Sequence, residues 1–307
     1  MKCLKRARNT FIHVLIFIGI FFIINTCKVK NPVEPPLACP DIVDGELAYK
    51  AVDYGVSWSP DGDSIVYRHV QLSAVDSYGL YIFDTLTASL RYLGGGLLAL
   101  YPRWSPTVGW IVYNMNAQIY KIKTNGDSLT QLTFTGRNFF PDWSPDGSKI
   151  VYDRTDSAFG IWMMDADGSN KKWIIRGRHP SFAPDGSKIL FVNGVQLNLV
   201  DTTGSNAVGL TSLSGQGTGY PSFSPKGDEI VFEHQLSGER ADVWVMNSDG
   251  TNLKRLTTDG GHAPVWSPDG SKILYTNTCQ YNGYLWIMNP DGSEKRQLTF
   301  ESFYAQI

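Results

Sequence analysis

One short phrase recurs six times along the chain and limits what the chain can fold into. Each copy is an aromatic residue followed by Ser or Ala and then Pro, and in five copies Gly stands two residues after the Pro. The copies begin at Trp58, Trp104, Trp143, Phe182, Phe223 and Trp266. Their prolines are 46, 39, 39, 41 and 43 residues apart. A period near 42 is typical of four-stranded propeller blades, so the spacing predicts six blades.

Each unit divides into four expected strands. An inner strand ends at the aromatic residue, and the Pro and Gly that follow suit a tight hairpin, because Pro presets φ and Gly tolerates positive φ. The second strands carry β-branched and aromatic triplets typical of buried strands, at 65–67, 111–113, 150–152, 189–191, 230–232 and 273–275. The third strands are expected at 80–84, 119–123, 161–165, 197–201, 243–247 and 285–289. The outer strands end in Leu-Thr at 132–133, 210–211, 256–257 and 298–299.

A single unit cannot bury both of its faces alone, so the six units must stack. A closed ring of stacked units leaves no open end. The expected fold is therefore all-β, a six-bladed β-propeller of four-stranded antiparallel blades over residues 42–307. Counting back from Trp58 places residues 46–50 in the outer-strand position of the preceding blade, which in a closed ring is the sixth. Residues 295–299 compete for that position, so the segment either adds a fifth strand or displaces them. An unpaired tether is the alternative.

The repeated pattern resembles a known family. The motif W-S-P-D-G-x-x-I-x-[FY], followed by [IL]-W-x-M-[ND]-x-D-G and by L-T, is similar to the WD40-like (PD40) repeat of TolB-type β-propellers, over about residues 54–300. Two copies depart from it at their turns, at 107–109 and 84–87. TolB also carries an amino-terminal α/β domain, which the residues before the first blade here do not match. The resemblance therefore implies the propeller rather than TolB's role in envelope constriction or its pairing with a peptidoglycan-associated lipoprotein.

The amino terminus has the pattern of an export signal. Four basic residues within the first eight precede an apolar run at 11–24, which is short for a membrane span. Residues 24–27, Ile-Asn-Thr-Cys, resemble the lipobox of bacterial lipoproteins, which implies cleavage after residue 26 and acyl chains on Cys27. Residues 27–41 are rich in proline and are expected to form a tether. An uncleaved anchor and ordinary secretion are alternatives, and all three place the propeller outside the cytoplasm. Lys28 after Cys27 favours the outer membrane.

The net charge and the cysteines limit the classes of partner and the cellular compartment that the sequence allows. The net charge is −2, and from residue 27 onward 23 basic and 29 acidic residues give −6. No basic tract follows the signal, which argues against nucleic acid as a partner. Cys39 and Cys279 remain as a candidate disulfide in an oxidising compartment, with two free thiols as the alternative. We expect a monomer.

Motifs of catalysis are absent from the sequence. It contains no G-x-S-x-G, H-E-x-x-H or C-x-x-C. The repeated D-x-D-G is interpreted as turn chemistry, although it resembles half of a calcium-binding loop. Oligogalacturonate lyases have related repeats and a metal held by several histidines, and His179 and His262 precede the inner strands of blades four and six. A metal-dependent lyase is therefore the alternative function, whereas we expect no enzyme, no metal and no cofactor.

A candidate binding site lies at the mouth, defined as the end of the ring where the inner strands begin. Three or four residues before the inner-strand aromatics stand residues of the types that supply most binding energy at interfaces. The proposed ligand-binding residues are Tyr54, Tyr101, Phe140, Arg178, His179, Tyr220 and His262, with Leu100 and Phe139 beside them. Packing of the loops against one another is the alternative role. The expected function is an exported envelope lipoprotein whose propeller binds a protein or peptide.

Overall fold

The computed structural model describes residues 51–71, 78–107, 109–277 and 283–299. The predicted signal peptide, the tether, Cys27, Cys39, Cys279 and the strand at 46–50 lie outside the described residues and stay predictions. Within the described residues, no helix has the length and apolar character to cross a bilayer.

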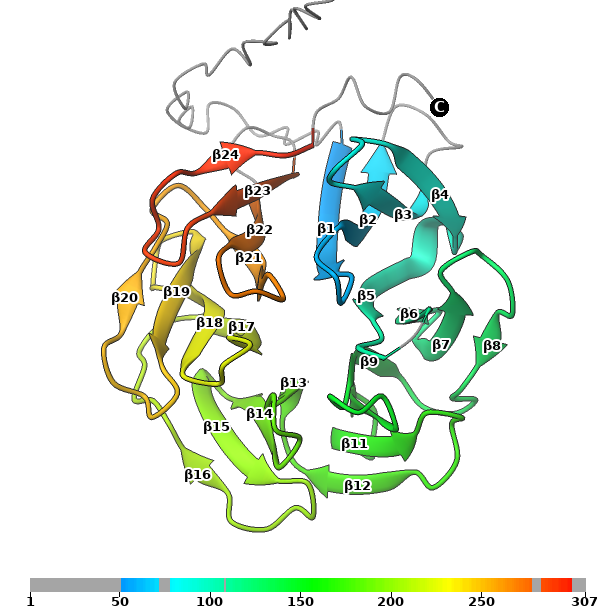
Figure 1. Ribbon diagram of the computed structural model, residues 1–307. Coiled ribbons are helices and arrows are strands. Elements are labelled where there is room, and N and C mark those ends of the chain that lie inside the picture. The colour runs from blue at the N-terminus through cyan, green and yellow to red at the C-terminus, as the bar shows by residue number, and fades with distance from the viewer. Residues whose placement is uncertain (1–50, 72–77, 108, 278–282, 300–307) are drawn as a thin grey trace, which may run out of the picture. The chain divides into compact units, whose positions relative to one another are not determined.

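Six four-stranded antiparallel sheets form a ring, as Figure 1 shows, and the expected fold is confirmed. The inner strands are β1 (Ala51–Trp58), β5 (Ala99–Trp104), β9 (Asn138–Trp143), β13 (Arg178–Phe182), β17 (Gly217–Phe223) and β21 (His262–Trp266). The second strands are β2 (Ser64–Gln71), β6 (Trp110–Met115), β10 (Lys149–Arg154), β14 (Lys188–Asn193), β18 (Glu229–Gln235) and β22 (Ile273–Asn277). Every inner strand ends at the aromatic residue that begins a repeat.

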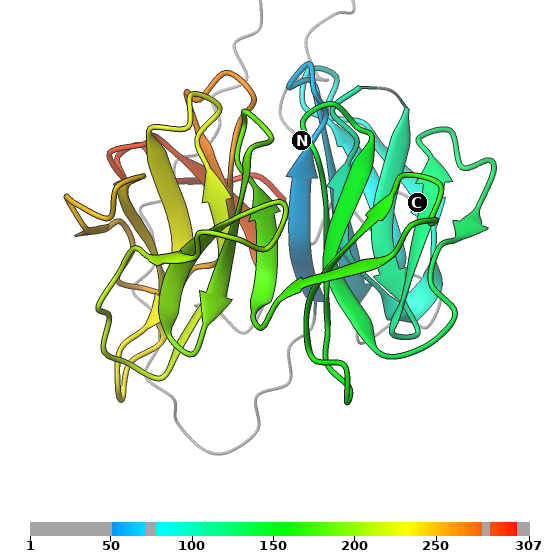
Figure 2. The ribbon, with the colours of Figure 1, turned by 90° about the horizontal axis from the view of Figure 1, so that it is seen from below.

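The two further strands of each blade complete the sheets. The third strands are β3 (Gly79–Asp84), β7 (Gln118–Lys123), β11 (Gly160–Asp165), β15 (Gln196–Asp201), β19 (Ala241–Asn247) and β23 (Tyr284–Met288). The outer strands are β4 (Leu90–Gly94), β8 (Thr130–Gln131), β12 (Lys172–Ile175), β16 (Val208–Gly209), β20 (Lys254–Arg255) and β24 (Arg296–Gln297). One 3-10 turn, η1 (Gly96–Leu98), links the first two blades. Figure 2 shows inner strand β1 running roughly along the ring axis.

The second-strand triplets form the core between blades. Ile111, Val112 and Tyr113 are almost fully buried. Ile111 and Tyr113 pack toward blade one, whereas Val112 packs toward blade three. Because successive side chains of a strand point to opposite faces, a strand between two blades is apolar on both sides. This explains why the triplets are continuous apolar runs rather than alternating ones.

In the four blades that have it, the Leu-Thr pair extends the sheet with a side chain. The hydroxyl Oγ1 of Thr133 accepts the Ile119 amide at 2.8 Å, and that of Thr257 accepts the Val243 amide at 2.9 Å. The outer strand is short, so the threonine hydroxyl takes over the next bond of the ladder. A buried amide left without an acceptor would cost free energy, which gives this threonine its place in the repeat.

Side chains and one backbone bridge, between Val52 and Gly283, close the ring between blade six and blade one. Every blade consists of four consecutive strands, so among the described residues no blade combines strands from both ends of the chain. At this seam, Asp53 is fully buried, and its Oδ2 accepts a hydrogen bond from Oγ1 of Thr299 at 2.5 Å. Its other oxygen lies 2.6 Å from Nδ1 of His69, and its amide donates to Gly283. Figure 1 shows β1 beside β21 to β24.

The seam also decides one open expectation about residues 46–50. Strand β24 pairs with β23 and fills the outer position of blade six. The alternative in which residues 46–50 displace that strand is therefore wrong. Addition as a fifth strand concerns residues outside the described ranges.

The turn between inner and second strands also contacts the preceding blade. A Cβ on Gly186 would lie 3.6 Å from Cδ of Pro145, which is the repeated proline one blade earlier. Across the seam, a Cβ on Gly62 would lie 3.8 Å from Cδ of Pro268. The repeated Pro and Gly therefore shape their own turn and also fit against the same turn of the neighbouring blade.

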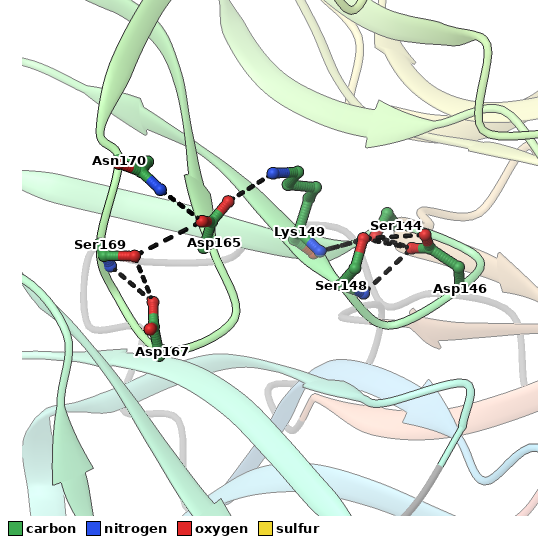
Figure 3. A network of polar contacts seen from close by, with 8 residues as sticks. All are labelled: Ser144, Asp146, Ser148, Lys149, Asp165, Asp167, Ser169 and Asn170. Atoms are coloured by element: carbon green, nitrogen blue, oxygen red, sulfur yellow. Dashed lines mark hydrogen bonds and ion pairs between the residues drawn. The ribbon is translucent and has the colours of Figure 1, made fainter.

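The acids of the turns accept local hydrogen bonds, as Figure 3 shows for blade three. Oδ1 of Asp146 accepts from Oγ of Ser144 at 2.6 Å and from the Ser148 amide at 3.0 Å. These bonds lower the pKa of Asp146 to about 2, with the Ser144 hydroxyl as the largest cause. Oδ1 of Asp167 likewise accepts from the amide and the hydroxyl of Ser169. The repeated acids thus act as turn caps.

Gly204 shows how closely the turn between the third and outer strands approaches the preceding blade. Its φ is +90°, and a Cβ there would lie 2.7 Å from the Ile174 carbonyl oxygen on β12. We expect Gly204→Ala to lower the free energy of unfolding by about 3 kcal/mol, because backbone strain and a clash with a neighbouring blade add together.

Gly238 provides the matched control for Gly204. It has a similar φ of +79°, but a Cβ there would meet nothing within 4 Å. Gly238→Ala should therefore cost about 1 kcal/mol, the strain alone. Urea unfolding of both variants measures the difference, and equal losses would show that this turn does not press on the preceding blade.

Candidate functional site

The inner strands share a bulge three residues before their terminal aromatic residue. The residues at this position have positive φ in all six blades, from +47° to +64°. They are Gly55, Tyr101, Phe140, His179, Tyr220 and Ala263. The pairing with the second strand shifts register at or beside this position in each blade, as expected for a bulge. For a residue other than glycine, this conformation costs about 1 kcal/mol or more.

Four of these residues and Tyr54 form an aromatic plug across the ring axis. The plug consists of Tyr54, Tyr101, Phe140, His179 and Tyr220, one from each of blades one to five. Rings of neighbouring blades lie close, with centroids 4.1 Å apart for Tyr101 and Phe140 and 4.7 Å apart for His179 and Tyr220. Contacts also cross the axis, because Oη of Tyr54 donates to Oη of Tyr220 at 2.6 Å. Blade six contributes the small Ala263.

The plug carries no charge of its own near neutral pH. Burial, followed by the charges of Arg178 and Arg103, lowers the pKa of His179 to about 3. Burial, followed by the charge of Glu233, raises the pKa of Tyr54 well above its ordinary value. Burial also raises the pKa of Tyr101 and of Tyr220. The plug therefore offers half-buried rings and phenol hydroxyls.

Two acids hold the bulges from the preceding blade. Oδ2 of Asp153 on β10 accepts the amide of His179 at 3.2 Å, and Oε2 of Glu233 on β18 accepts the amide of Ala263 at 3.2 Å. Both acids directly follow the buried triplet of their second strand. Asp153 is fully buried, and burial raises its pKa to about 7, although the His179 amide and Arg178 act against this.

The residues just before the bulges lean toward the preceding blade. Nδ1 of His262 lies 3.3 Å from Oε2 of Glu233. Burial would lower the pKa of His262, but the hydrogen bond and charge of Glu233 raise it above its ordinary value. In blade four, Arg178 lies over the ring of Phe159, with Cζ 5.4 Å from the ring centroid.

The structure groups most of the predicted site residues but gives them different surroundings. Tyr54, Tyr101, Phe140, His179 and Tyr220 meet at the axis, whereas Arg178 and His262 lie against their preceding blades. Sequence reasoning missed the supporting acids Asp153 and Glu233. A signal was available, because each is a charged residue directly after an apolar triplet. It also missed Phe159, for which the repeat pattern gives no signal.

The two histidines considered as metal ligands have other contacts in the structure. His179 belongs to the plug, and His262 pairs with Glu233. Within the described ranges, no three His, Cys, Asp or Glu side chains are grouped as a ligand set for a metal ion would be.

Comparison with known proteins decides the family. A family model described as PD40, TolB beta propeller domain, matches residues 48–218, which is more than half of the chain. The chain belongs to this family. TolB from Acinetobacter baumannii is 22% identical, with a TM-score of 0.66 over 83% of this chain and 65% of that chain. A putative TolB from Agrobacterium tumefaciens is 21% identical, with a TM-score of 0.62 over 81% of this chain and 91% of that chain. These structural likenesses show the fold.

Enzymes also share the fold of this PD40 propeller. An oligogalacturonate lyase in complex with manganese is 14% identical, with a TM-score of 0.58 over 82% of this chain and 81% of that chain. A relative described as the uncharacterized peptidase YuxL of Bacillus subtilis (strain 168) is 36% identical over 58 residues, or 18% of this chain. The chain spans 9% of the length of YuxL and 65% of the Acinetobacter TolB. Neither protein as a whole is therefore a guide to activity here.

Proposed function

We propose that the propeller is a protein- or peptide-binding module of the cell envelope and that its ligand contacts the aromatic plug. The protein is exported and held at the membrane, with the outer membrane favoured, through a lipid on Cys27. The pattern of the first 27 residues supports this localisation, and the family supports a binding propeller.

The observation that carries this proposal is the strain stored in the plug. Gly55 and Ala263 show that the bulge needs no large side chain. The other four blades nevertheless place an aromatic or imidazole ring there, at about 1 kcal/mol or more of backbone strain each. Such strain is concentrated at functional sites, and half-buried aromatic rings with hydroxyl groups are the typical anchors of protein interfaces.

The resemblance of this chain to the oligogalacturonate lyase is a resemblance of fold alone. The alternative function as a lyase rested on a metal held by His179 and His262. His179 instead packs in the plug, and His262 pairs with Glu233. A carbohydrate acid stays a possible ligand class only as an outcome of the binding tests below.

Photo-crosslinking in living cells tests the site. p-Benzoylphenylalanine at Phe139, which directly precedes the bulge of blade three, should give one discrete adduct with an envelope protein or peptide. The same amino acid at Val208, an exposed position on outer strand β16, is the control and should give none. Combining the Phe139 probe with Tyr101→Ala and Tyr220→Ala should reduce the adduct at least about tenfold, because the anchoring rings are lost.

The outcome depends on folding as well as on binding. Alanine occupies the same bulge in blade six, so the double variant should stay folded, and its thermal unfolding is measured in parallel. A folded variant that crosslinks as strongly as the parent would place the site elsewhere. Equal adducts from Phe139 and Val208 would do the same.

A further inference from the structure

Two arginines share one aromatic ring at the mouth. Cζ of Arg176 lies 5.1 Å and Cζ of Arg178 lies 5.4 Å from the ring centroid of Phe159, which belongs to the preceding blade. Both arginines are exposed, and the phenylalanine is half-buried. Contact with a ring face holds a guanidinium group in place while its N–H groups remain able to bind an acceptor.

These arginines have no ion-pair partner in the part of the chain that the structure describes. The equivalent cation in blade six, His262, is paired with Glu233. In blade three the corresponding acid is Asp153, which is shorter by one methylene group. It is fully buried and accepts the His179 amide at 3.2 Å. The shorter acid thus holds the bulge but forms no ion pair with Arg178.

The other side of the mouth carries three acids, each in an ion pair with a cation. Glu239 and Asp242 both bind Arg255, and Glu233 binds His262. A ligand with both charges suits such a mouth, since its anionic group can bind the arginines while its remainder avoids repulsion by the acids. A peptide can meet this requirement. A uniformly anionic polyuronate would face the acids of blades five and six.

We propose that Arg176 and Arg178, held on Phe159, form a carboxylate-binding subsite, and that the ligand is a peptide segment that presents a carboxylate there. The carboxylate is that of the peptide's own terminus or of an Asp or Glu side chain. A guanidinium group binds both oxygens of a carboxylate through parallel N–H bonds, and two such groups can share one carboxylate. Because Arg178 directly precedes His179 of the plug, the neighbouring part of the peptide can contact the rings. This inference rests on the proposed function.

Random heptapeptide libraries test the subsite on the purified full chain. One library ends in a free carboxylate, a second ends in an amide, and a third ends in an amide and lacks Asp and Glu. Bound peptides are counted by mass spectrometry. We expect the third library to be retained at least about tenfold less than the first. Retention of the second library shows whether the arginines bind the terminal carboxylate or a side-chain carboxylate.

Charge-removing variants show whether the two arginines are responsible. The double variant Arg176→Gln and Arg178→Gln should abolish the preference among the three libraries. Peptides that contact the plug through aromatic side chains should still bind weakly. Arg178→Lys should weaken the preference, because an ammonium group cannot bind both oxygens in the same plane. Arg296→Gln, at an exposed position on outer strand β24, is the control and should change nothing. The thermal unfolding of each variant is compared with that of the parent.

Three results would overturn the inference, and they separate it from the proposed function. Equal retention of the three libraries would reject the subsite and leave the binding module in place. No retained peptide from any library would reject both. Binding of oligogalacturonate that depends on Arg176 and Arg178, with no peptide retained, would assign the subsite to a sugar acid instead.

Discussion

Replacing Asp53 by alanine should lower the free energy of unfolding by about 3 kcal/mol. Asp53 is fully buried at the seam, where it accepts the Thr299 hydroxyl and lies 2.6 Å from Nδ1 of His69. Removing its carboxyl group leaves both partners buried without this acceptor, and breaking such a network typically costs several kcal/mol. No described blade combines strands from the two ends of the chain, and the contacts of Asp53 and the backbone bridge between Val52 and Gly283 link the two blades across the seam.

Urea unfolding, monitored by tryptophan fluorescence, measures the effect. Thr299→Ser is the control, since it keeps the hydroxyl that donates to Asp53 and accepts the Leu285 amide at 3.0 Å. It should cost about 1 kcal/mol, in line with the loss of one buried methyl group. If Asp53→Ala costs no more than Thr299→Ser, the apolar cluster of blades one and six holds the seam without the aspartate.

The architecture could be predicted from the sequence because the same four-strand pattern occurs six times. The aromatic residues end the inner strands, and the triplets fill the second strands, since both follow from local preferences and burial. The contacts between copies are a different matter. That Gly186 fits against Pro145, or that Gly204 approaches Ile174, depends on how neighbouring blades stack. No single repeat contains that information.

The site was predictable in position but only partly in chemistry. Counting back from the aromatic residues located the plug, because a repeat places equivalent residues at equivalent points of a ring. The sequence could not show that Tyr101 or His179 lies at a bulge with positive φ, which is a property of the backbone. It also placed His179 among the proposed ligand-binding residues without showing its protonation state, and burial keeps that imidazole neutral near pH 7.

Asp153→Asn should stabilise the protein at high pH and leave its stability unchanged at low pH. Burial raises the pKa of Asp153 to about 7 in the folded state, from an ordinary aspartate value near 3.8 in the unfolded chain. Between these values the folded state holds the proton more tightly, so the parent protein loses stability through this group as pH rises from about 4 to about 7. Asparagine resembles the protonated acid in shape, and its Oδ1 can still accept the His179 amide.

The two proteins should therefore have equal free energies of unfolding at pH 3, below the unfolded-state pKa of the aspartate, and should differ most above pH 7. The full difference in pKa corresponds to at most about 4 kcal/mol, and relaxation around a buried charge makes a gain of about 2 kcal/mol the expected result at pH 8. Urea unfolding from pH 3 to 8 measures it. Glu233→Gln is the comparison, because that acid holds the equivalent bulge but also pairs with His262, so its loss should destabilise rather than stabilise. A gain for Asp153→Asn that is the same at every pH would show that the pKa of this carboxyl group is not raised in the folded state. The His179 amide and Arg178 would then compensate its charge despite the burial.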